Sequence, residues 1–146
     1  MNEQQAAFLL TLLKNTPVVI EFKKALVREF FKAREELNRR EVQREIKAPV
    51  RRSLTDAIRD SGENERMSGY AYNTYTNLIY KSVTGYTARQ LTDKRGAAKN
   101  AHAVDFMTAD ELAEATKREA QVCTLLDLGM SYEGIRALLT RKERRQ

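Results

Sequence analysis

The sequence predicts an all-α protein, and two observations carry this prediction. The chain has 146 residues but only six glycines and two prolines, whereas a β-sandwich or barrel needs turn residues every ~8–12 positions. Apolar residues recur at spacings of three and four, as in Val19, Phe22, Leu26 and Phe30, which is the period of a helix with one buried face. We therefore expect an N-terminal helical hairpin with one long helix, followed by a bundle of short helices.

The hairpin is predicted to span residues 1–48. Asn2 can cap a first, strongly apolar helix, because its side chain can accept a hydrogen bond from a free backbone N–H of the first turn. Thr16 then stands where an N-cap is expected and Pro17 where the first helical residue is expected, so a second helix begins there. Its pattern continues until Pro49, and because proline disfavours helix in the residue before it, we expect the helix to end at that point.

Residues 52–140 are predicted to form the bundle, followed by a basic tail at 141–146. Gly85 and Gly96 stand where they can end helices. Thr108 and Glu111 have the spacing of a capping box, in which each side chain bonds to the backbone of the other residue. The predicted helices cover 53–60, 70–84, 87–95, 108–128 and 131–140, with a loop at 61–65 and a flexible link at 97–105.

A homodimer is predicted from the apolar face of the hairpin. This face is larger than two helices can bury against each other, and exposed apolar patches of that size mark interfaces. The residues expected at the dimer interface are Phe8, Leu12, Val19, Phe22, Leu26 and Phe30.

The positive charge of the chain is concentrated in two short segments. The net charge is +6. Residues 39–52 contribute +4 from six bases and two acids, and residues 141–146 contribute +3, whereas residues 108–140 sum to −3. A basic helix can follow a DNA backbone, or it can bind an acidic protein surface. The bases expected to contact such a partner are Arg39, Arg40, Arg44, Lys47, Arg51 and Arg52. A solvated helix with internal ion pairs is the competing interpretation, but it leaves the surplus of four charges unexplained.

Two segments resemble helix-turn-helix units, which need a glycine in the turn and apolar residues at fixed packing positions. The segment around Gly129 has the better packing pattern, with Leu128, Met130, Ile135 and Leu138 at the packing positions. Its exposed face, with Tyr132, Glu133 and Arg136, lies in the acidic region, where phosphates are repelled. The segment around Gly85 has the poorer packing pattern and the better charge. Its candidate nucleic-acid contacts are Lys81, Arg89, Lys94 and Arg95.

Five of the six tyrosines lie between Tyr70 and Tyr86. Interleaved with asparagine and basic residues, they could form a surface that stacks on bases. Tyrosine is also a normal residue of a small helical core or of an oligomer interface. The pattern favours core or interface over base stacking.

No residues are arranged as catalysis or metal binding would require. One cysteine and one histidine exclude a zinc cage, a disulfide framework and a Cys–His nucleophile pair. Cys123 has the apolar neighbours of a core residue, and the acids at 110–114 are explained by the favourable effect of negative charge in the first turn of a helix. We therefore expect a protein that is not an enzyme and that has no cofactor and no metal.

A cytoplasmic location is expected as well. The chain has no run of about 18 apolar residues that could span a membrane and no secretory signal peptide. A single thiol fits a reducing compartment.

Residues 3–17 (EQQAAFLLTLLKNTP) and 21–30 (EFKKALVREF) resemble the closing helices of the N-terminal module of the phage regulatory Rha family and of related temperate-phage antirepressors. Residues 53–96 and the run LLDLGMSYE at 125–133 are similar to C-terminal regions attached to such modules. The pattern starts at Met1, so we expect the upstream part of the family module to be lacking.

The resemblance implies a phage-encoded regulatory protein, either a transcriptional regulator or an antirepressor, in the host cell cytoplasm. It acts by binding, with the basic helix on DNA phosphates. The alternative is a protein-only inhibitor or adaptor that binds a repressor or another regulator, of the host or of a phage, through its 70–86 surface and its acidic final helices.

Overall fold

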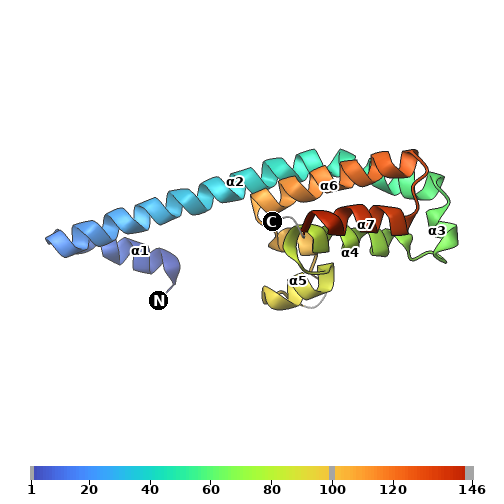
Figure 1. The fold of residues 1–146 in the computed structure, drawn as a ribbon. Coiled ribbons are helices and arrows are strands. Elements are labelled where there is room, and N and C mark those ends of the chain that lie inside the picture. Colours follow the sequence, from blue (N-terminus) through green and yellow to red (C-terminus); the bar gives the residue numbers. More distant parts are fainter. Residues whose placement is uncertain (1, 99–100, 144–146) are drawn as a thin grey trace. The chain divides into compact units, whose positions relative to one another are not determined.

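A computed structural model describes residues 2–98 and 101–143, and every regular element in these ranges is a helix (Figure 1). The all-α prediction is therefore confirmed, including the long helix followed by shorter ones. The elements are α1 (Glu3–Leu12), α2 (Pro17–Asp60), α3 (Glu63–Arg66), α4 (Ala71–Thr84), α5 (Ala88–Lys94), the 3-10 helix η1 (Ala103–Phe106), α6 (Ala109–Asp127) and α7 (Tyr132–Glu143). None of the helices in the described ranges is long and apolar enough to cross a membrane.

Local capping signals fix where several helices begin and end. The Asn2 side chain accepts from the backbone N–H of Gln5 at 2.8 Å, and the Gln5 side chain accepts from the Asn2 N–H at 3.0 Å. The same reciprocal pair forms at the start of α6, between Thr108 and Glu111. Gly85 ends α4 with a φ of 78°, which is the left-handed region that favours glycine. Each of these interactions links residues close in sequence.

The predicted helix end at Pro49 is wrong, because α2 continues through this proline to Asp60. A proline inside a helix removes one backbone hydrogen bond and costs about 3 kcal/mol. The turns that follow it bury Leu54, Ala57 and Ile58, and burying a large aliphatic side chain yields about 1.5–3 kcal/mol each. Tertiary packing thus outweighs the local preference, and the predicted separate helix at 53–60 is the end of α2.

Two segments expected to be irregular contain short helices. The predicted loop at 61–65 includes the start of α3, and the predicted link at 97–105 includes most of η1. The chain divides into two compact units, Met1–Asn38 and Arg39–Gln146. The division lies within α2, earlier in the chain than the boundary expected at residue 48.

The Met1–Asn38 unit is a helix pair without a core of its own. Helix α1 folds back beside the first part of α2 (Figure 1). Lys23 of α2 binds the segment that connects the two helices, since it donates to the Leu13 carbonyl at 3.3 Å and to the Asn15 side chain at 3.0 Å. No residue between 2 and 38 is buried. The apolar side chains of this unit therefore remain exposed.

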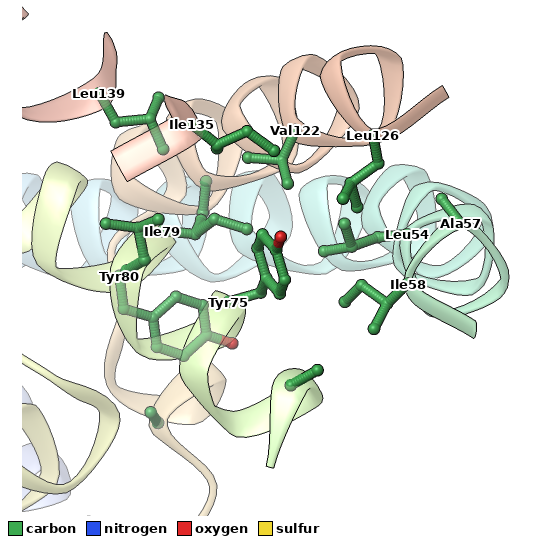
Figure 2. Packing of buried hydrophobic residues seen from close by; sticks show 14 of the residues in the cluster. Leu54, Ala57, Ile58, Tyr75, Ile79, Tyr80, Val122, Leu126, Ile135 and Leu139 are labelled. Atoms are coloured by element: carbon green, nitrogen blue, oxygen red, sulfur yellow. The ribbon is translucent and has the colours of Figure 1, made fainter. Parts of the chain in front are cut away.

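The Arg39–Gln146 unit has one hydrophobic core, to which four helices contribute. Helix α6 runs parallel to the 39–60 part of α2, and α4 and α7 pack with them (Figure 1). Figure 2 shows the interdigitated side chains at its centre. Among them are Leu54 and Ile58 of α2, Tyr75 and Ile79 of α4, Val122 and Leu126 of α6, and Ile135 and Leu139 of α7.

The tyrosine-rich segment belongs largely to this core. Tyr75 and Tyr80 are buried, and the Tyr75 ring packs edge-to-face on Tyr132 with ring centroids 5.3 Å apart. Tyr72 and Tyr86 are partly buried, whereas Tyr70 is exposed. The segment is therefore mainly a core element and offers little aromatic surface to a partner.

Helix α3 holds an ion pair between the buried Glu63 carboxylate and the exposed Arg66 guanidinium. Arg66 donates two hydrogen bonds of 2.9 Å to the Glu63 carboxylate, and the Tyr75 hydroxyl donates to Glu63 Oε2 at 3.0 Å. The hydrogen bonds from Arg66 are the main reason that the pKa of Glu63 lies below its ordinary value of 4.5.

Acid is expected to destabilise the protein in part through Glu63. Because the folded-state pKa is the lower one, the unfolded chain binds more protons, and stability falls as the pH drops below about 4.5 toward the folded-state pKa. Urea midpoints measured across this pH range should fall less steeply for Glu63→Gln than for the wild type. Equal slopes would contradict a role for this carboxylate in acid unfolding.

Candidate interaction surfaces

The basic segment at 39–52 packs along acidic groups of its own unit. Arg39 Nη2 lies 2.7 Å from Asp110 Oδ1. Arg44 forms an ion pair with Asp105, and Arg40 donates to the Asp105 backbone carbonyl. The charges of Arg39 and Arg44 are therefore balanced within the fold, whereas the hydrogen-bond partner of Arg40 is a neutral carbonyl.

Lys47 and Arg51 converge on one buried carboxylate. Lys47 Nζ lies 2.5 Å from Glu119 Oε1, and Arg51 Nη1 lies 3.4 Å from the same oxygen. Arg51 also donates to Thr76 Oγ1 at 2.7 Å. Lys47 is 5% exposed and Glu119 is 0% exposed. Burial lowers the pKa of Lys47, and the charge of Glu119 opposes this shift.

The prediction that Lys47 contacts phosphates is therefore wrong, because a buried ammonium cannot reach an external anion. Three carboxylates of η1 and α6, which lie far away in sequence, offset most of the surplus of four charges at 39–52. A charge sum over a short window cannot detect such a match. Arg52 differs from its neighbours, since it is exposed and its side chain has no ion pair or hydrogen bond to any described residue.

The second predicted set of bases, around Gly85, is also divided between paired and unpaired residues. Arg95 forms two hydrogen bonds to Glu111, of 2.6 and 2.8 Å, which raise the pKa of the guanidinium. Lys94 lies over the Tyr86 ring, 4.2 Å from its centroid. Arg89 and Lys81 are exposed, and within the described part of the chain neither side chain has a hydrogen bond or an ion pair.

Lys81 lines a groove between α4 and α7 with a volume of about 350 Å³. Arg136 of α7 lines the same groove, and its side chain also has no partner among the residues that the structure describes. The sequence patterns placed Lys81 and Arg136 in two separate motifs, and the packing of α7 on α4 brings them to one site. The remaining residues of the lining are Thr74, Asn77, Leu78, Ser82, Thr87, Tyr132 and Thr140.

The two expected helix-turn-helix segments both occur as helix–turn–helix arrangements, α4–Gly85–α5 and α6–Gly129–α7. The packing expected around Gly129 is only partly present. Ile135 is buried as expected, but Leu128 and Leu138 are exposed.

The residues predicted at a dimer interface lie in the exposed helix pair. Phe8, Phe22 and Phe30 are 64%, 54% and 62% exposed, and Leu12 and Leu26 are exposed as well. Val19 is half-buried. The structure thus leaves this apolar face uncovered within the chain.

Histidine and cysteine are common catalytic residues, and the chain has one of each. His102 is exposed, and burial raises the pKa of the Cys123 thiol, which leaves it less reactive. Among the side chains described at 2–98 and 101–140, no three His, Cys, Asp or Glu residues gather as a metal site would require. The features that remain are an apolar face on Met1–Asn38 and a cationic groove on Arg39–Gln146.

Comparisons with known proteins add no relatives to this description. A scan against protein-family models finds no match to the chain, and no curated protein matches it.

Proposed function

We propose that the chain is a regulatory protein that acts by binding, as a homodimer held together by its Met1–Asn38 unit. The observation that carries the proposal is a helix pair with large exposed apolar side chains and no buried residue between positions 2 and 38. Ordering a helix costs backbone entropy that burial must offset, and most helical stability comes from packing an apolar face. A second copy supplies that packing.

The exposed area is sufficient for a stable interface. A whole aromatic side chain buries about 150–250 Å², so each half-exposed apolar side chain of this unit exposes roughly 100 Å². Together these side chains expose on the order of 1,000 Å². A standard-size interface buries about 800 Å² on each partner. The exposed residues are Phe8, Leu9, Leu12, Leu13, Val18, Ile20, Phe22, Leu26, Val27, Phe30, Phe31 and Leu37.

The regulatory role is supported by the resemblance of residues 3–30 to the Rha family and to temperate-phage antirepressors. We place such a protein in the cytoplasm of the host cell. The resemblance also implies a DNA contact through residues 39–52. This contact has less support, because Arg39, Arg44, Lys47 and Arg51 already pair with carboxylates of η1 and α6. A protein-only adaptor, which uses the same apolar face on a partner helix, is the alternative.

Replacing Phe22 and Phe30 with glutamate is expected to dissociate the dimer. Each phenylalanine contributes about 1.5–3 kcal/mol when buried, and every ~1.4 kcal/mol is a factor of ten in affinity. The dissociation constant should therefore rise at least about a hundredfold in sedimentation equilibrium. Because the second copy supplies the packing that orders this helix pair, dissociation should also lower the helical signal in circular dichroism, whereas the Arg39–Gln146 unit keeps its own core.

Val42→Glu is the matched control, since Val42 is an exposed apolar residue of α2 outside the Met1–Asn38 unit. This variant should remain as dimeric as the wild type. Wild-type protein that sediments only as a monomer at tens of micromolar would overturn the proposal. Dissociation by Val42→Glu but not by the double variant would also contradict it.

A further inference from the structure

We infer that the groove between α4 and α7 binds a phosphodiester group of a nucleic acid. The inference adds a ligand and a site to the proposed function and does not depend on self-association. It rests on the residues of one groove within the Arg39–Gln146 unit: its charges, its hydrogen-bond donors and its volume.

The charge of the groove is positive and uncompensated. Lys81 and Arg136 come from different helices and line one cavity of about 350 Å³. None of the residues in its lining is an aspartate or a glutamate. Several other arginine and lysine side chains of this unit are instead paired with carboxylates, such as Asp110, Glu119 and Glu111. Glu133, the acid nearest to Arg136 in the chain, forms an ion pair with Arg66 instead. Two cations in one groove whose lining has no carboxylate provide a site for an anion.

The neutral polar groups add donors to this site. Asn77 Oδ1 accepts from the Ala88 N–H at 3.1 Å, so the two N–H bonds of its amide remain available. The Thr87 oxygen accepts from the Gln90 N–H at 3.4 Å, which leaves its own hydroxyl hydrogen free to donate. With Lys81 and Arg136, four side chains can donate to one ligand.

Three other hydroxyl groups of the lining do not compete for that role. Thr74, Ser82 and Thr140 each donate to a backbone carbonyl three or four residues earlier, at 2.8, 2.7 and 2.8 Å. The donors left in the lining are one ammonium, one guanidinium, one amide and the hydroxyls of Thr87 and Tyr132. Such a set matches a ligand that carries several acceptor oxygens and a negative charge.

A phosphodiester fits this set better than a peptide carboxylate does. Contacts to the nucleic-acid backbone come from arginine and lysine together with threonine, asparagine and tyrosine side chains, and these residue types make up most of the lining. The Tyr132 ring and Leu78 also line the groove and offer apolar surface to a sugar or a base.

The test compares two double variants of the full chain that change the net charge by the same amount. Lys81→Gln with Arg136→Gln removes the cations of the groove. Arg52→Gln with Lys117→Gln removes one arginine and one lysine that are exposed and unpaired among the described residues but do not line it. Binding to a labelled random-sequence DNA duplex, and to one of its single strands, is measured by fluorescence anisotropy across a salt series.

The groove variant is expected to weaken binding at least about tenfold and to reduce the slope of log K against log salt by about 1–2, because each duplex phosphate contact contributes about 0.9. The control variant should alter the slope by less than half as much. The groove variant loses affinity for the duplex and for the single strand, and the form with the larger loss is the one that the groove binds.

Three results would overturn the inference: no binding of wild-type protein to either DNA at low salt, equal losses in both variants, or competition by polyglutamate as effective as that by DNA of equal charge. The last result would assign the groove to an acidic protein partner. Sedimentation of the same samples reports self-association separately, so failure of this inference is distinguishable from failure of the proposed dimer.

Discussion

Replacing Glu119 with alanine is expected to destabilise the Arg39–Gln146 unit by about 3–5 kcal/mol, the usual cost of leaving one member of a buried ion pair without its partner. Glu119 is fully buried and balances the buried Lys47 ammonium at 2.5 Å. Without this carboxylate, Lys47 must either hold an uncompensated charge in the core or lose its proton. Chemical denaturation followed by circular dichroism measures the loss.

The pH dependence of the variant provides a second readout. Burial already lowers the pKa of Lys47, and removal of Glu119 takes away the interaction that opposes this shift. The unfolded chain then binds more protons than the folded one over a wider range below 10.5. The stability of Glu119→Ala should therefore increase with rising pH more strongly than that of the wild type.

Replacing both members of the pair separates the cost of a broken pair from the value of the pair itself. Lys47→Met with Glu119→Leu should recover most of the loss, because apolar replacement of a buried pair is often neutral or stabilising. Asp56→Asn is the control, since its ion pair with Arg59 is exposed and worth at most about 1 kcal/mol. A loss in Glu119→Ala as small as in this control would contradict the buried pair.

Replacing Tyr75 with alanine is expected to cost about 3–5 kcal/mol as well, the range for truncating a large buried aromatic residue. The side chain is fully buried at the centre of the core (Figure 2). It also packs edge-to-face on Tyr132 and donates a hydrogen bond to Glu63. The measurement is the free energy of unfolding in urea.

Two milder variants separate the contribution of the Tyr75 hydroxyl from that of its ring. Tyr75→Phe keeps the ring and loses only the hydrogen bond to a carboxylate, so we expect about 1.5–3 kcal/mol. Tyr70→Ala changes an exposed tyrosine of the same segment and should cost no more than about 0.5 kcal/mol. If Tyr75→Ala were no more destabilising than Tyr70→Ala, the assignment of the tyrosine segment to the core would be wrong.

Helix α2 continues through Pro49, which local sequence preferences did not predict. A proline disfavours the helical conformation of the residue before it, and this preference predicted that α2 ends at Pro49. The prediction omitted Leu54, Ala57 and Ile58, whose burial depends on helices α4, α6 and α7, far away in the chain. Such burial becomes visible only when the packing partners are known.

The sequence by itself determined the all-α class and most helix starts. The capping pairs of Asn2 with Gln5 and of Thr108 with Glu111 join residues three positions apart, so their hydrogen bonds follow from local order. The apolar character of residues 8–30 was equally plain from composition and spacing. The exposure of these side chains agrees with the expectation of an apolar face that the hairpin cannot bury alone.

Only the tertiary structure decided which charges are available to a partner. The sequence pointed to Lys47 and the arginines beside it, whereas α6 supplies Glu119 and Asp110 to neutralise them. It gave no reason to join Lys81 with Arg136, which the packing of α7 on α4 brings to one groove. Electrostatic balance depends on distance in space, and helices that are remote in sequence set that distance.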